Sequence, residues 1–160
     1  EEFKNFILEK FKHTEITIDP SNVDLLLAFT DGHPYFTQQL CHELWNIASE
    51  SSVVQKNDIE KAIAVIIRIH NDLFVRIWDS LTVLQRKLLV GMSAEDGVSS
   101  VYSISFINKY ELISPSHVAR AIDQLLKDGT VEKVNDAYAL SDVFFKEWIK
   151  AKTTTGKTKA

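Results

Sequence analysis

One short string brings together residue types that suit a ligand. Gly32-His33-Pro34 stands directly before a predicted helix. A residue before proline is held in extended backbone, as a helix cap requires, and proline fits the first helical position because its missing N–H would have no partner there. Glycine lets the chain turn into the helix. The string places an imidazole, a pyrrolidine ring and the positive end of a helix dipole together, which predicts either a site for an anionic or aromatic ligand or a helix start without one.

A second candidate set lies on the helix that we predict after Ser114-Pro115, a hydroxyl cap followed by proline. Its outer side carries residues that suit base edges and phosphates, namely Ser116, His117, Arg120, Gln124 and Lys127. Asp123 and Asp128 share this helix, and the turn predicted beyond it is Asn135-Asp136 rather than a basic sequence. We therefore predict that this surface contacts protein, within or outside the chain, with DNA as the alternative.

The remaining chemistry-bearing residues predict no catalytic or metal site. The five histidines, at positions 13, 33, 42, 70 and 117, lack the spacing of metal ligands. Cys41 falls among the apolar residues of its helix, which favours packing. As the single cysteine it excludes a disulfide framework and indicates a reducing compartment, so we expect a cytoplasmic protein.

The spacing of apolar residues predicts the elements that position these sites. Four helices are expected in the first half, the last running unbroken from Ile59 to Trp78, with an extended connector over residues 16–20. After Trp78 the order is helix, helix, helix and a two-stranded hairpin around Asn135-Asp136, which is typical of a winged helix-turn-helix. We predict a mainly α fold with a helical domain over 1–78, a winged helix over 79–151 and a flexible tail over 152–160.

Gly32-His33-Pro34, continued by Gln39-Leu40 and Leu44-Trp45, resembles the G-x-P motif in the lid of AAA-type P-loop ATPases of the STAND class. In some prokaryotic families of this class a winged helix follows the lid. The resemblance extends from about Phe3 to Ile149 and lies in the order of the elements. It implies a helical AAA-type lid bundle over 1–78, with Gly32, His33 and Pro34 facing nucleotide. It also implies a parent that binds ATP or ADP with Mg, whose N-terminal P-loop core is this chain's partner.

No P-loop of the form G-x-x-x-x-G-K-[ST] occurs in the 160 residues. Gly156-Lys157-Thr158 has Ala151 where the first glycine is required. We therefore expect a fragment without ATPase activity or tightly bound nucleotide, whose catalytic core precedes Glu1. The alternative is a DNA-binding winged-helix transcriptional regulator whose N-terminal helices dimerise or hold a ligand.

Charge and hydropathy limit the partners. The chain has 18 Lys and Arg against 22 Asp and Glu, and the net charge is −4. Residues 81–149 contain 7 basic and 9 acidic side chains, so strong non-specific binding to nucleic acid is not expected. The longest apolar stretch, Ala62 to Ile67, is far shorter than the ~20 residues of a membrane span, and we expect no membrane partner.

Overall fold

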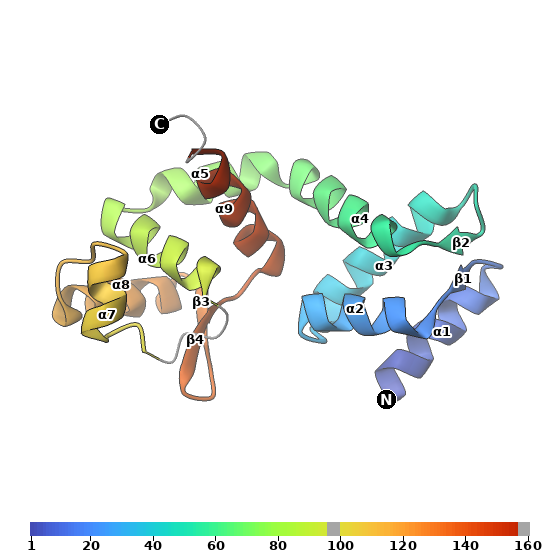
Figure 1. Ribbon diagram of the computed structural model, residues 1–160, viewed down its shortest axis with the longest axis horizontal. Coiled ribbons are helices and arrows are strands. Elements are labelled where there is room, and N and C mark those ends of the chain that lie inside the picture. The colour runs from blue at the N-terminus through green and yellow to red at the C-terminus, as the bar shows by residue number, and fades with distance from the viewer. Residues whose placement is uncertain (96–99, 157–160) are drawn as a thin grey trace. The chain divides into compact units, whose positions relative to one another are not determined.

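The computed structural model describes residues 1–95 and 100–156, without the side chains of 155 and 156. Within these residues the chain forms nine helices and two small two-stranded sheets, which confirms the mainly α fold (Figure 1). It divides into two compact units, unit 1 over Glu1–Ile69 and unit 2 over His70–Ala160.

Unit 1 is a small helical domain with a short parallel sheet. Its elements in order are α1 (Glu2–His13), β1 (Thr17–Ile18), α2 (Pro20–Thr30), α3 (Pro34–Ala48), β2 (Val53–Val54) and α4 (Lys56–Ile69). The predicted extended connector contains β1, which pairs with β2 in the register Thr17↔Val53. The buried Asn22 side chain strengthens this link, because its Nδ2 donates to the Val54 carbonyl at 3.2 Å.

The buried carboxylate of Asp58 organises the start of α4. Asp58 Oδ2 accepts from the Gln55 backbone N–H at 2.8 Å, and Oδ1 accepts from Lys61 Nζ at 2.8 Å. These two bonds hold the pKa of Asp58 below its ordinary value, the Lys61 bond having the larger effect, although burial opposes them. The charge therefore helps to stabilise the folded unit.

The prediction of one helix from Ile59 to Trp78 is wrong. Helix α4 ends at Ile69 and α5 (Asn71–Ser80) begins after His70, whose φ of −90° and ψ of 3° leave the helical region. The apolar spacing continues across this single residue, so periodicity alone gives no sign of the break.

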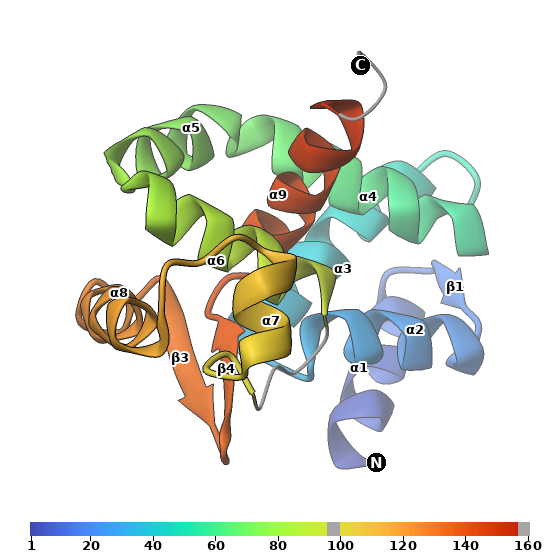
Figure 2. The ribbon, with the colours of Figure 1, turned by 60° about the vertical axis from the view of Figure 1, so that its left-hand side comes forward.

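Unit 2 has the predicted order of three helices and a hairpin. After α5 come α6 (Val83–Ala94), α7 (Ile104–Lys109), α8 (Pro115–Lys127), β3 (Val131–Val134), β4 (Ala137–Leu140) and α9 (Val143–Gly156). Strands β3 and β4 are antiparallel with Val134 opposite Ala137, and Asn135 turns the chain at φ 56°. The hairpin projects away from the helices of its unit (Figure 2). A capping box starts α6: Gln85 N–H donates to Thr82 Oγ1 at 3.3 Å, and Thr82 N–H donates to Gln85 Oε1 at 2.9 Å.

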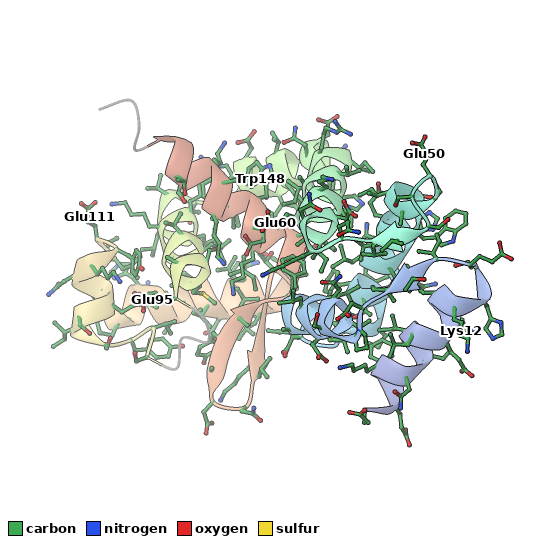
Figure 3. All side chains as sticks on the ribbon, turned by 45° about the vertical axis from the view of Figure 1, so that its right-hand side comes forward. Lys12, Glu50, Glu60, Glu95, Glu111 and Trp148 are labelled. Atoms are coloured by element: carbon green, nitrogen blue, oxygen red, sulfur yellow. The ribbon has the colours of Figure 1, made fainter. Side chains whose placement is uncertain are left out.

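An aromatic cluster joins α5 to α9. The Phe74 ring lies 5.2 Å from that of Phe145 and 6.2 Å from that of Trp148, which is labelled in Figure 3. Trp148 Nε1 donates to Asn71 Oδ1 at 3.0 Å, so the buried indole keeps its hydrogen bond. Helix α5, which we predicted at the end of the first domain, therefore packs with the winged-helix elements.

Helices α6 and α7 approach closely at Gly91. A Cβ atom on Gly91 would lie 2.7 Å from Phe106 Cζ and 2.7 Å from Tyr110 Cδ2. Only glycine fits here without displacing these rings, so this position is determined by packing rather than by backbone conformation.

Helix α9 runs to Gly156, so residues 152–156 of the predicted flexible tail are helical, and 157–160 lie outside the described residues. No helix in the described part of the chain is long and apolar enough to cross a membrane.

Candidate functional site

The Gly32-His33-Pro34 turn joins α2 to α3 as the sequence predicts. Gly32 adopts φ 64°, His33 is the N-cap of α3 and Pro34 occupies its first turn. The Gly32 N–H donates to the Leu27 carbonyl and the His33 N–H to the Thr30 carbonyl, both at 2.9 Å. These bonds close the end of α2 and place the start of α3 directly after it.

Hydrogen bonds of two buried hydroxyl groups, one on each side of the turn, hold its backbone in place. Thr30 Oγ1 and Thr37 Oγ1 are hydrogen-bonded at 2.7 Å, and Thr30 Oγ1 also donates to the Leu26 carbonyl at 3.0 Å. The His33 ring makes no capping hydrogen bond and packs on Phe36 with centroids 4.7 Å apart. His33 and Pro34 are both exposed. The turn thus exposes an imidazole and a proline ring to solvent, above a pair of hydrogen-bonded threonines.

The N-terminus of α8 is also built as predicted. The Ser114 hydroxyl caps the helix and is hydrogen-bonded to His117 Nδ1 at 2.8 Å and to Ser116 Oγ at 3.0 Å. The inner side of α8 is buried through Val118, Ala121, Ile122 and Leu125. The structure therefore places Ser116 and His117 together at the cap, where the Ser116 hydroxyl and His117 Nδ1 are both bonded to the Ser114 hydroxyl.

Three further predicted contact residues, Arg120, Gln124 and Lys127, lie on the exposed side of α8. Gln124 Nε2 donates to both oxygens of Asp128, at 2.9 and 3.1 Å. Arg120 and Lys127 form no ion pair with a carboxylate in residues 1–95 and 100–156. Both cations are therefore open to a partner.

Helix α8 followed by the hairpin is the arrangement of a recognition helix and its wing. The family described as "Probable winged helix domain" matches residues 72–151, half of the chain. The chain belongs to this winged-helix family. No curated protein and no solved structure matches the chain.

The outer face of the winged helix has mixed charge. Its exposed basic residues are Arg120, Lys127 and Lys133, and its exposed acidic residues are Asp123, Asp128, Glu132 and Asp136. Binding to duplex DNA needs a surplus of positive charge to replace the counterions of the phosphates. The face as a whole lacks this surplus.

Two tyrosines that the sequence analysis missed meet beside the wing. The hydroxyls of Tyr102 and of Tyr138 on β4 lie 3.2 Å apart, and their rings are perpendicular with centroids 6.0 Å apart. Burial raises the pKa of Tyr102, and the bond to Tyr138 and the charge of Asp123 raise it further. No spacing rule connects residues this far apart, since only the folded hairpin brings β4 to Tyr102.

Proposed function

We propose that this chain is the regulatory lid and winged-helix part of a STAND-class AAA-type ATPase, and that its winged helix contacts protein. The observation that carries the proposal is the order of parts: a helical unit whose α3 opens at Gly32-His33-Pro34 precedes a winged helix in one chain. Cys41, half-buried and single, fits a cytoplasmic parent.

In the parent, ATP or ADP with Mg binds a P-loop core that this sequence does not contain. The exposed ring of His33 and the proline beside it contact the base or phosphate side of the nucleotide. Binding there favours one position of the lid, and the winged helix passes that state to a protein surface as a shift in populations.

The first test is the coding sequence upstream of Glu1. The proposal requires a P-loop in the same polypeptide, and an initiation codon directly before Glu1 would contradict it. In the longer protein we expect His33→Ala and Pro34→Ala to weaken nucleotide affinity by about tenfold, which is about 1.4 kcal/mol. Leu25→Ala, an exposed position on α2, is the matched control and should leave affinity unchanged.

The second candidate function is a DNA-binding regulator, favoured by the exposed Arg120 and Lys127, which have no carboxylate partner in the part of the chain that the structure describes. Selection of bound duplexes from a random-sequence pool, followed by fluorescence anisotropy with the selected duplexes at physiological salt, separates the two functions. If the winged helix contacts protein, the dissociation constant stays in the non-specific range of ~10⁻⁴ to 10⁻⁶ M and Arg120→Ala changes it less than about twofold.

Any residual DNA binding should come from lysines near the C-terminus, so deleting residues 153–160 should weaken it and flatten its salt dependence. A nanomolar, sequence-specific complex that survives this deletion and is lost in Arg120→Ala would establish the regulator instead. In that case the exposed side of α8 reads DNA.

A further inference from the structure

Unit 1 contains a groove between α1 and α3 with a volume of about 600 Å³. We call it the α1–α3 groove. Its lining residues are Phe3, Phe6, Ile7, Lys10, Phe11 and Thr14 from α1 and its C-terminal end, and Pro34, Thr37, Gln38, Cys41, His42 and Trp45 from α3. The lining is mainly apolar, although parts of it face solvent.

The two walls have the same helical spacing. Starting from Phe3 on one side and from Pro34 on the other, each wall uses residues i, i+3, i+4, i+7, i+8 and i+11. This spacing marks one face of a helix over three turns, which is roughly 16 Å at a rise of 1.5 Å per residue. The groove is therefore as long as a three-turn helix.

The floor and rim differ in exposure. Ile7, Phe11 and Thr37 are buried, whereas 52% of Phe6 and 40% of Trp45 are accessible to solvent. Large aromatic side chains on both rims leave an apolar surface that a broad occupant would cover. A single alkyl chain bound on the floor would leave the aromatic side chains of both rims exposed to solvent. The exposure of these rims therefore favours a helix over a small amphiphile as the occupant.

The charge of the groove is opposite to that of its surroundings. Residues 1–69 contain 11 Asp and Glu against 6 Lys and Arg. No acidic side chain is among the described residues that line the groove, but Lys10 and His42 are. Lys10 Nζ lies 5.1 Å from the centre of the Phe6 ring and has no carboxylate partner within the described part of the chain. The groove thus complements an anionic partner.

We propose that the α1–α3 groove binds one amphipathic helix of a partner protein, about three turns long. The apolar side of that helix faces the groove floor, and Asp or Glu residues at its border face Lys10 and His42. This is recognition of a helix in a groove, with Trp45 and Phe6 as the aromatic rims. The inference does not depend on the nucleotide or DNA function of the chain.

The test uses two dye-labelled peptides of 14 residues and the complete 160-residue chain. Both peptides carry leucines at i, i+3, i+4, i+7, i+8 and i+11, and they differ only in having Glu or Lys at the bordering positions. Fluorescence anisotropy at physiological salt should show the acidic peptide binding at least about tenfold tighter, or about 1.4 kcal/mol. Equal affinity, tighter binding of the basic peptide or no binding of either would overturn the proposal.

Variants then locate the binding surface. Lys10→Glu should abolish the preference for the acidic peptide, whereas Trp45→Ala and Phe6→Ala, on opposite walls, should each weaken its binding by about tenfold. Leu25→Ala, an equally exposed apolar residue on α2 outside the groove, should change nothing. Circular dichroism checks that each variant is folded. A response to Leu25→Ala equal to that of both wall variants would place the peptide elsewhere and contradict the proposal.

Two other occupants have distinct outcomes. If dodecanoate below its micellar concentration binds the chain more tightly than the acidic peptide and displaces it, the groove is a site for small amphiphiles. If the chain self-associates without peptide and Trp45→Ala makes it monomeric, the groove is occupied by a second copy. Either result would overturn a partner helix as the occupant.

Discussion

The α1–α3 groove and the outer face of the winged helix use their polar groups differently. On the winged helix the exposed cations Arg120 and Lys127 share their face with the carboxylates of Asp123 and Asp128, and Gln124 is bonded to Asp128. In the groove Lys10 faces apolar surface without a carboxylate partner in the described residues. Membership of a winged-helix family therefore does not by itself identify the surface best prepared for a ligand, because binding depends on groups left available on that surface.

The two units also require glycine for different reasons, close packing at Gly91 in unit 2 and backbone conformation at Gly32 in unit 1. The largest effect of a substitution on stability is expected in unit 2. Gly91→Ala should lower its free energy of unfolding by about 2–3 kcal/mol, because the new methyl group overpacks the contact between α6 and the rings of Phe106 and Tyr110. Urea denaturation followed by circular dichroism measures this. In a Tyr110→Leu background the penalty should be smaller by about 1 kcal/mol, since part of the obstruction is gone. Peptide binding in the groove of unit 1 should stay unchanged.

The corresponding change in unit 1 should have a smaller effect. Gly32→Ala should destabilise by about 1.5 kcal/mol, because φ of 64° strains an L-residue although no atom lies within 4 Å of the added Cβ. Gly32→Asn is the matched variant and should cost less, since asparagine tolerates this conformation. Equal unfolding free energies for the Ala and Asn variants in urea denaturation would show that conformation is not the reason for glycine here.

The pH dependence of unit 1 should reflect Asp58. Its pKa is below the ordinary value of 3.8, so its contribution is fully present above that value and is lost as pH falls through the lower pKa of the folded state. We expect Asp58→Asn to cost about 1 kcal/mol at neutral pH and to reduce the loss of stability in acid. Lys61→Met removes the larger cause of the shift and should have a similar effect. Thermal unfolding between neutral pH and pH 2 measures both.

The smallest effect expected is at the tyrosine pair of unit 2. Tyr138→Phe should destabilise by about 0.5 kcal/mol, because the exposed hydroxyl bond to Tyr102 is lost. The pKa of Tyr102 should fall but stay above its ordinary value of 10.0, since burial is the larger cause of its rise. In the wild-type protein this raised pKa makes stability decrease as pH rises above that value. Ultraviolet absorbance of tyrosinate measures the titration, and a return to the ordinary pKa would contradict the role of burial.

Helix beginnings and turns were predictable because their causes are local. The Ser114 hydroxyl caps α8 by accepting from the His117 backbone N–H three residues away, and the capping box of Thr82 and Gln85 also spans three residues. Gly32 and Pro34 each satisfy a backbone requirement at their own position. The position of the candidate residues at the ends and faces of helices follows from these local rules.

Contacts between distant residues could not be predicted in the same way. The pairing of β1 with β2, the meeting of Tyr102 with Tyr138 and the packing of α5 on α9 each join separate parts of the chain. Periodicity indicates which side of a helix is apolar, but it does not say what that side contacts. The apolar sides of α1 and α3 were recognisable in the sequence, although the groove between them was not.

The amino-acid sequence by itself determined where most helices begin, where the hairpin turns and which residues face outward on α8, because hydrogen bonds and backbone limits within four residues decide these features. Tertiary structure decided the break at His70, the close contact at Gly91 and the α1–α3 groove. Such features depend on which apolar faces come together. Many pairings satisfy the same local pattern, and packing of the complete unit selects one of them.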